Sequence, residues 1–325
     1  MTRIRYERLP TERANPSIGE LDRVSPTTVA RLMTRADHKA VRAVARAAPI
    51  IGRAVHSIAS VLADGGRLIF VGAGTSGRLG VIEAAECPPT FGTPASLVQA
   101  VIAGGRRAVF RSVEGAEDDG PAGAREIRRR ARAGDVVVGI AASGVTPFVL
   151  AALREARRRR ALPILVTCNP RVPAGAARLV IRLAVGPEVI AGSTRLSAGT
   201  ATKLALNALT TAVFARLGKV YGNRMVDLRP RSAKLRARAV RLVRELGAVS
   251  ERDAQRLLRA AGGSAKLAIA MARLGTDAAT ARRRLQNAAG SLRQVLERRG
   301  RRAVGSDPRT YARRRCGGPS PWPSP

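Results

Sequence analysis

Acidic residues are scarce in this sequence, and six of them gather in one stretch. Of the 23 aspartates and glutamates in 325 residues, residues 83–119 hold Glu83, Glu86, Glu114, Glu117, Asp118 and Asp119. Glu83 and Glu86 are three residues apart, which predicts one shared helical face, and Pro88-Pro89 predicts that the helix ends near Glu86. One glutamate from each half of the stretch could act as general acid and base. Solvated acids that match nearby arginines explain the spacing equally well.

Three hydroxyl-rich loops could bind an anion: GAGTSGR at 72–78, ASGVTP at 142–147 and GSTR at 192–195. Each opens a predicted helix, so backbone N–H groups and hydroxyls converge on a helix N-terminus. For each loop alone, helix N-capping is an equally good explanation. The recurrence favours a small phosphorylated ligand, with a nucleotide as the competing hypothesis. The candidate binding residues are Gly74, Thr75, Ser76, Gly77, Arg78, Ser143, Gly144, Thr146, Ser193, Thr194 and Arg195.

The first loop spells GxGxxG at 72–77, but its surroundings do not fit the nucleotide motifs that share this pattern. No lysine follows the last glycine, which excludes a Walker loop. The acidic residue that a dinucleotide ribose requires about 20 residues later is missing from 97–103.

The chain has few histidines and cysteines with which to build a metal site or a catalytic centre. Only His38 and His56 occur, and Cys87, Cys168 and Cys316 form no CxxC pair. Histidine-based zinc sites, Ser-His-Asp or Cys-His catalysis and a disulfide framework are therefore disfavoured. We expect no metal, and carboxylates, hydroxyls or lysines must carry any catalysis.

The formal net charge of +35 indicates affinity for a polyanion such as nucleic acid. Only five of the 58 basic residues are lysine, however, which is typical of a genome-wide bias toward arginine codons, and aromatic residues make up 3% of the chain. So few aromatics disfavour base-stacking platforms. We expect no specific nucleic-acid partner, and sequence-preferring retention on DNA at physiological salt would revive that alternative.

Short apolar runs alternate with helical stretches along the chain, which predicts a doubly wound parallel sheet of the α/β class. The five runs lie at 67–72, 97–103, 135–141, 163–168 and 179–184. Ligands bind such sheets beyond the carboxyl ends of the strands. Helical patterns at 26–63 and 198–217 flank this region. We expect an N-terminal helical arm at 1–53, the α/β domain at 54–220, a small helical C-terminal region at 221–298 and a disordered tail at 299–325.

Two features refine these outer regions. The segments 259–266 and 286–293 resemble each other, which favours two helical hairpins in the C-terminal region. No apolar run reaches the roughly 18–20 residues of a membrane span, and the start lacks the apolar stretch of a signal peptide. We therefore expect a cytoplasmic protein without a membrane partner.

Long strings across most of the chain closely resemble the N-acetylmuramic acid 6-phosphate etherase family. They include GAGTSGRLGVIEAAECPPTFGTP at 72–94, VEGAEDD at 113–119, TERANP at 11–16, CNP at 168–170, GKVYGNRMVD at 218–227 and AAGGSAKLAI at 260–269. Where the family usually reads STRMKAGTAQK, residues 193–203 differ at Leu196, Ser197 and Thr202, so a commonly basic position holds a serine.

The resemblance implies a sugar-isomerase-type phosphosugar-binding domain, a homodimer and no cofactor. The implied activity converts N-acetylmuramic acid 6-phosphate and water to N-acetylglucosamine 6-phosphate and D-lactate in cell-wall recycling. The AECPP and GAED strings place the implied catalytic pair at Glu86 and Glu117, and burial in a cleft would raise the pKa of the base. Lys266, in the GGSAKLAI string, is a further candidate to contact substrate, with a solvated lysine as the alternative.

Two alternative functions could use the same sequence motifs. A noncatalytic phosphosugar sensor similar to glucokinase regulatory protein would bind ligand without turnover, but the presence of both Glu86 and Glu117 in intact strings favours an enzyme. A phosphosugar isomerase could use the same loops and a glutamate base. The lack of a histidine placed for ring opening disfavours it.

Overall fold

A computed structural model describes residues 7, 9–172, 175, 177–228, 230 and 232–297. The chain divides into two compact units, Met1–Arg229 and Pro230–Pro325. The tail predicted at 299–325 lies outside the described residues. The four-part division expected from the sequence stays a prediction.

The first unit is built on a five-stranded sheet with the order β2-β1-β3-β4-β5, in which every neighbouring pair is parallel. This confirms the predicted α/β class and all five predicted strands. The strands are β1 (Leu68–Gly72), β2 (Val98–Ile102), β3 (Val136–Ile140), β4 (Leu162–Thr167) and β5 (Leu179–Arg182).

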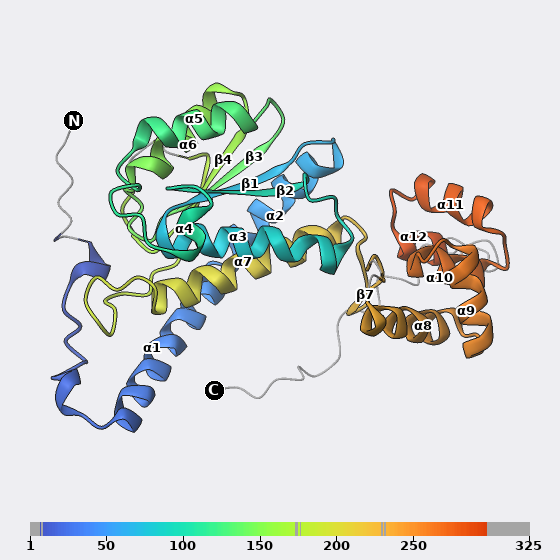
Figure 1. The fold of residues 1–325 in the computed structure, drawn as a ribbon, viewed down its shortest axis with the longest axis horizontal. Helices are drawn as coiled ribbons and strands as arrows, with labels where there is room; N and C mark the ends of the chain where they lie inside the picture. Colours follow the sequence, from blue (N-terminus) through green and yellow to red (C-terminus); the bar gives the residue numbers. More distant parts are fainter. Residues whose placement is uncertain are drawn as a thin grey trace, which may run out of the picture. The chain divides into compact units, whose positions relative to one another are not determined.

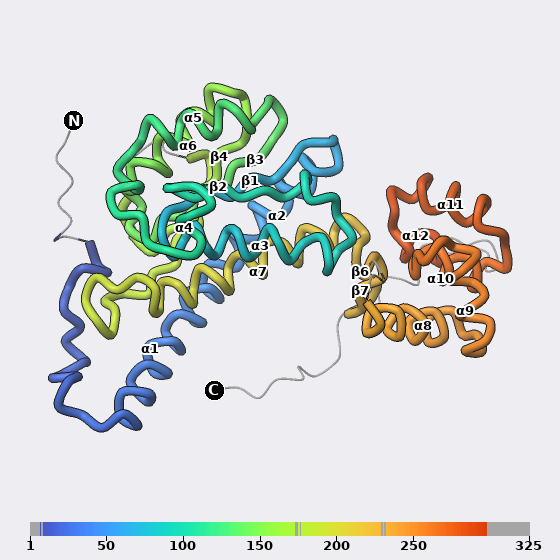
Figure 2. Tube along the Cα trace, in the orientation of Figure 1, coloured from blue at the N-terminus to red at the C-terminus, as the bar shows by residue number. Residues whose placement is uncertain are grey.

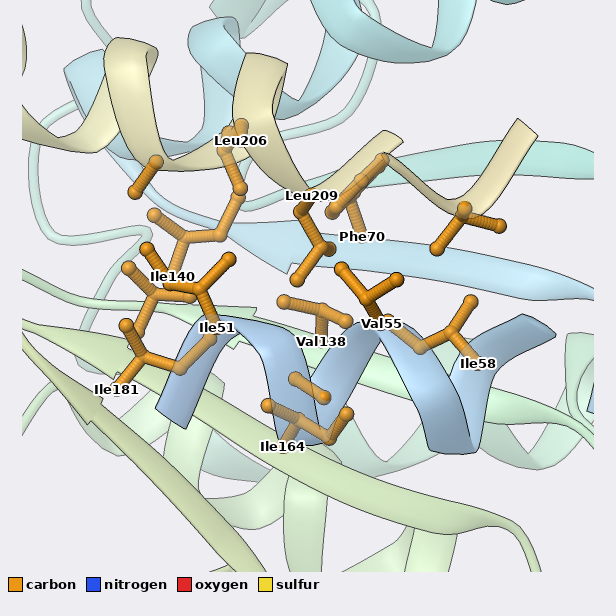
Figure 3. Close-up of a cluster of buried hydrophobic side chains, with 14 of the residues drawn as sticks. Ile51, Val55, Ile58, Phe70, Val138, Ile140, Ile164, Ile181, Leu206 and Leu209 are labelled. Carbon is orange, nitrogen blue, oxygen red and sulfur yellow. The ribbon is translucent and has the colours of Figure 1, made fainter. Parts of the chain in front are cut away.

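Helices cover both faces of the sheet (Figure 1). On one face, Phe70, Val138 and Ile164 pack with residues of α2 (Ala48–Ala63) and α7 (Ser197–Arg216), as Figure 3 shows. On the other face, side chains that alternate with these along the strands pack with α5 (Gly120–Arg130) and α6 (Pro147–Arg158). Because both faces are covered, the central strands are apolar throughout, as parallel strands usually are.

The helical pattern at 26–63 forms two helices rather than one. α1 (Pro26–Arg46) begins at Ser25, whose hydroxyl accepts a hydrogen bond from the Thr28 amide, and α1 lies beside α7 (Figure 2). The break falls at Ala47, and α2 carries Pro49 in its first turn. Proline has no N–H to donate and its ring clashes with the preceding turn, so the chain starts a new helix there.

The prediction that the helix after β1 ends near Glu86 is wrong. α3 extends over Gly74–Phe91 with both prolines inside its last turns, and it ends at Gly92, which adopts a left-handed conformation (φ 65°). The Phe91 ring stacks on Phe214 of α7 with centroids 4.6 Å apart. This tertiary packing offsets the backbone hydrogen bonds that the prolines forgo.

At the amino ends of the strands, a buried carboxylate fixes the starts of β1 and β3. Asp135 is fully buried and accepts hydrogen bonds from the backbone N–H groups of Arg67 and Arg132, each 2.9 Å long. The Arg67 guanidinium adds an ion pair of 2.7 Å to the same carboxylate. Both strands that carry the first two hydroxyl-rich loops are thereby anchored at their opposite ends.

The remaining elements of the first unit are short. They are two 3-10 helices in the N-terminal arm, η2 (Pro10–Glu12) and η3 (Leu21–Arg23), the helical turn α4 (Arg107–Phe110) and a hairpin of β6 (Val220–Tyr221) and β7 (Arg224–Met225).

The second unit is helical, as predicted. Its helices are α8 (Ala233–Gly247), α9 (Glu251–Ala260), α10 (Ala265–Leu274), α11 (Ala278–Asn287) and α12 (Leu292–Glu297). The two similar segments at 259–266 and 286–293 both span the end of one helix and the start of the next, so they are equivalent turns. Within the described ranges, no helix of either unit is long and apolar enough to cross a membrane.

Candidate active site

A pocket of about 450 Å³ opens at the carboxyl ends of β1 and β3. This is the edge at which parallel α/β sheets bind their ligands. The pocket is lined by the loops after both strands, by the turn before α5, by the loop before α7 and by the N-terminal arm. Its lining residues are Leu9, Glu12, Ala73, Gly74, Thr75, Ser76, Glu117, Asp118, Ile140, Ala141, Ala142, Ser143, Thr146, Pro147, Gly192 and Thr194.

The first loop brings the N-terminus of α3 directly to the pocket. Ala73 is the N-cap residue and no described side chain caps the helix, so the first N–H groups remain available to an anion. The helix approaches the strand closely because Gly77 lacks a side chain. A Cβ at Gly77 would lie 2.8 Å from the Gly72 oxygen and 2.6 Å from Ile102.

The second loop is held in shape by residues that follow β4. The Asn169 amide donates to the Ser143 carbonyl at 2.8 Å, and the Thr167 hydroxyl donates to the Ala142 carbonyl at 3.2 Å. Gly144 has a φ of +71°, and a Cβ there would lie 2.8 Å from the Thr167 hydroxyl. The packing therefore fixes the Ser143 and Thr146 hydroxyls, which lie 3.3 Å apart at the pocket wall.

Glu117 lies in the turn that precedes α5, and its position is set from two sides. Its carbonyl accepts a hydrogen bond of 2.9 Å from the Phe148 N–H in the first turn of α6. Asp119 follows as the N-cap of α5 and accepts from the Ala122 amide at 2.8 Å. The Glu117 side chain is exposed and lines the pocket, as its neighbour Asp118 does.

Glu86, the other predicted catalytic residue, does not line this pocket. It is exposed on α3, ten residues beyond the pocket residue Ser76, which corresponds to about 15 Å along a helix. The structure therefore does not bring Glu86 and Glu117 together within one chain. Both are exposed, so the burial expected for a catalytic base is not provided by one chain alone.

Glu83 and Glu86 both lie on α3, three residues apart as predicted, but they differ in burial. Glu83 is 6% exposed and accepts hydrogen bonds from the Asn207 amide at 2.7 Å and from the Thr210 hydroxyl. Burial raises the pKa of Glu83, and these two hydrogen bonds oppose the rise. Glu83 thus joins α3 to α7, whereas Glu86 faces outward.

The third hydroxyl-rich loop differs from the first two because a protein carboxylate already caps its helix. Glu188 is fully buried and accepts hydrogen bonds of 2.9 Å from the amides of Ser197 and Ala198, at the N-terminus of α7. Burial raises the pKa of Glu188, against the effect of these bonds. Thr194 still lines the pocket. The anion-binding end of α7, however, is occupied by Glu188.

The other predicted binding residues lie outside the described pocket lining. Arg78 donates to the Val109 carbonyl at 3.0 Å. Lys266 belongs to the second unit, is 6% exposed and donates to the Gly290 carbonyl at 2.9 Å. Gly77, Gly144, Ser193 and Arg195 flank lining residues without being among them. A contact of these residues with substrate stays a prediction.

Sequence reasoning missed Leu9 and Glu12 as pocket residues and Glu188 as the cap of α7. The arm had no periodic pattern to place it against the sheet, although TERANP at 11–16 was part of the family resemblance. Glu12, Glu117 and Asp118 all line the pocket, yet the described residues contain no cluster of histidine, cysteine or acidic side chains suited to hold a metal ion.

Family models match the part of the chain that carries this pocket. The model for the glucokinase regulatory protein N-terminal SIS domain matches residues 50–157, and the general SIS domain model matches residues 121–212. A solved phosphoheptose isomerase from Francisella tularensis is 18% identical, with a TM-score of 0.44, over 58% of this chain and 98% of that one. The two family models together identify a SIS domain within residues 50–212.

Curated relatives extend the match to nearly the whole chain. N-acetylmuramic acid 6-phosphate etherase of Parasynechococcus marenigrum is 49% identical over 90% of this chain and 93% of its own length. The etherase of Symbiobacterium thermophilum is 53% identical over 81% of this chain and 88% of its own length. The chain belongs to the N-acetylmuramic acid 6-phosphate etherase family, which confirms the resemblance.

Proposed function

We infer that this protein cleaves the D-lactyl ether of N-acetylmuramic acid 6-phosphate with water, giving N-acetylglucosamine 6-phosphate and D-lactate. The supporting observation is the match to curated etherases, 49% identical over 90% of this chain, combined with a pocket at the strand ends that contains Glu117. We propose that the reaction serves cell-wall amino-sugar recycling in the cytoplasm.

The phosphate binds at the first two hydroxyl-rich loops in this proposal. The N-terminus of α3 has no side-chain cap among the described residues, and the helix dipole favours an anion there. The hydroxyls of Thr75, Ser76, Ser143 and Thr146 line the same pocket and supply neutral donors. The end of α7 contributes less because Glu188 occupies it.

The two glutamates act on the opened sugar chain. One removes the proton from the carbon beside the aldehyde, and the bond between C3 and the lactyl oxygen breaks with the electron pair leaving on oxygen. Glu86 gives that oxygen a proton and then takes one from the incoming water, which adds to C3, while the first proton returns to C2. Atoms and charges balance, and the two carboxyl groups end in their starting states.

We propose that Glu86 reaches the pocket from a second copy of the chain in a homodimer. In one chain Glu86 lies about 15 Å along α3 from the pocket residue Ser76. Two large apolar side chains lie exposed in the same region, Ile82 on α3 at 56% and Phe110 on α4 at 87%. We propose that the homodimer covers these two side chains. Association would also provide the burial that a catalytic base needs.

Incubation with the substrate in water enriched in heavy oxygen tests the activity. We expect D-lactate without the label and N-acetylglucosamine 6-phosphate with the label on the sugar, as cleavage on the sugar side requires. Ligand binding without lactate release would instead favour a noncatalytic phosphosugar sensor.

Mixing two inactive variants tests the shared site. Glu86→Gln and Glu117→Gln should each lose most turnover, yet co-refolded mixtures should recover about a quarter of wild-type activity. Half of the dimers are then hybrids. In each hybrid, one site combines the unmodified Glu86 of one chain with the unmodified Glu117 of the other, and the second site carries both substitutions. No recovery from mixed dimers of confirmed hybrid composition would place both glutamates in one chain, and a monomer by light scattering would exclude the arrangement.

A further inference from the structure

The N-terminal arm forms one wall of the pocket and is fastened to the first unit at several points. The Thr11 carbonyl accepts a hydrogen bond of 2.8 Å from the Gly192 N–H, and the Asn15 amide donates to the Pro187 carbonyl at 3.2 Å. Leu9 and Thr11 are buried. The arm therefore holds Glu12 at the pocket by contacts with the loop that precedes α7.

The Glu12 carboxylate lies over Gly192, where the chain leaves room for it. A Cβ at Gly192 would lie 2.9 Å from Glu12 Oε2, and Gly192 has a φ of +78°, a conformation that favours glycine. The carboxylate makes no hydrogen bond or ion pair with any residue that the structure describes. Because Glu12 is exposed and lines the pocket, a ligand in the pocket can reach this acceptor.

The pocket lining is acidic, although the chain as a whole is strongly basic. Its described lining holds three carboxylates, Glu12, Glu117 and Asp118, and neither lysine nor arginine, whereas the chain has 58 basic and 23 acidic residues. Ionised carboxylates only accept hydrogen bonds. They would repel a phosphate but would bind the hydroxyl and acetamido N–H groups of an amino sugar.

We propose that Glu12 is a specificity-determining residue that accepts a hydrogen bond from a hydroxyl or amide N–H of the amino sugar. This inference rests on the proposed function for the identity of the ligand. The helix N-termini and hydroxyls hold the phosphate, and Glu12 holds the sugar from the side of the arm. The arm therefore determines which phosphate ester is retained.

Binding of two probes to Glu12→Ala tests the role. N-acetylglucosamine 6-phosphate and inorganic phosphate are titrated calorimetrically into the full-length wild-type and variant proteins. Loss of a hydrogen bond to a charged acceptor corresponds to roughly a 10- to 100-fold weaker affinity. We expect that loss for the amino sugar phosphate and an unchanged affinity for inorganic phosphate. Glu20→Ala is the matched control because Glu20 lies on the same arm and pairs with Arg23 at the surface.

Equal weakening of both probes would overturn the proposal, since Glu12 would then act by holding the arm in place. Unchanged affinity for both would overturn it as well. Glu12→Asp keeps the charge but withdraws it by one methylene, so an intermediate affinity for the amino sugar phosphate is expected. Lactate release is assayed separately. A wild-type protein that binds in a Glu12-dependent manner without turnover would refute the proposed activity and leave the role of Glu12 intact.

Discussion

Glu83 and Glu86 lie three residues apart on α3, and the structure predicts that their removal has opposite consequences. Glu83 is buried and hydrogen-bonded to Asn207 and Thr210 of α7, whereas Glu86 is exposed. Glu83→Ala should lower stability and spare the chemistry of the remaining folded protein. Glu86→Ala should spare stability and abolish most turnover.

The size of the stability loss follows from the two hydrogen bonds of Glu83. Hydrogen bonds to a charged group contribute about 1.5–3 kcal/mol each. Part of this is recovered in the variant, because Asn207 is only partly buried and the Thr210 hydroxyl can donate to the Leu206 carbonyl at 3.3 Å. Removal of a buried carboxylate also relieves its desolvation penalty, which offsets part of this cost. We expect a net loss of about 2–4 kcal/mol in the free energy of unfolding. For a unit of this size that corresponds to a fall of roughly 5–15 °C in Tm.

Thermal and urea unfolding, together with lactate release measured well below Tm, separate the two effects. Glu86→Ala should change stability by no more than about 0.5 kcal/mol, as exposed substitutions usually do. It should reduce kcat by about a hundredfold to ten-thousandfold. Glu83→Gln is the conservative control, because its amide oxygen can still accept from Asn207. A Glu83→Ala protein that melts with the wild type, or a Glu86→Ala protein with near-normal kcat, would refute the assignment.

The remaining predictions concern pH, the phosphate cradle and the approach of α3 to the sheet. Burial raises the folded-state pKa of Glu83 above its ordinary 4.5. Between pH 4.5 and this raised pKa, the folded state therefore binds more protons than the unfolded state does. Stability of the wild type relative to Glu83→Gln should therefore fall as pH rises from 4.5 through the raised pKa, as pH-dependent urea melts can check. Ser76→Ala and Ser143→Ala should raise KM severalfold with little change in kcat, and an unchanged KM in both would contradict the cradle. Gly77→Ala should lower Tm by several degrees, since a Cβ there would lie 2.8 Å from the Gly72 oxygen.

The sheet was predictable from the sequence because its strands are short apolar runs bounded by glycine, proline or polar residues. Their parallel direction follows from the alternation with helices, and the loops after β1 and β3 were found for the same reason. The order β2-β1-β3-β4-β5 was not predicted, because alternation alone does not say which strands are neighbours. The end of α3 was not predictable. Its last turn depends on the stacking of Phe91 on Phe214, and no local pattern announces a contact across more than a hundred residues.

Long-range contacts also explain what was missed in the site. Glu83 and Glu86 look alike in the sequence, and only the position of α7 separates a buried acceptor from an exposed acid. Glu12 reaches the pocket because Asn15 contacts Pro187, 172 residues away along the chain. The hydroxyls before α7 resemble an anion site, yet Glu188, nine residues before Ser197, already accepts the N–H groups that an anion would need.

The acids identify function in this chain better than its large positive charge does. Arginine is so abundant that its presence at a surface says little, whereas several of the scarce acids make specific contacts. Asp135 joins two strands, Glu83 joins two helices and Glu188 caps a third. Glu12 and Glu117 have no such structural partner among the described side chains, and both line the one pocket that lies at the carboxyl ends of β1 and β3 in the described part of the chain. In the proposed site, a ligand that brings donors of its own, as an amino sugar does, would use these two exposed acceptors.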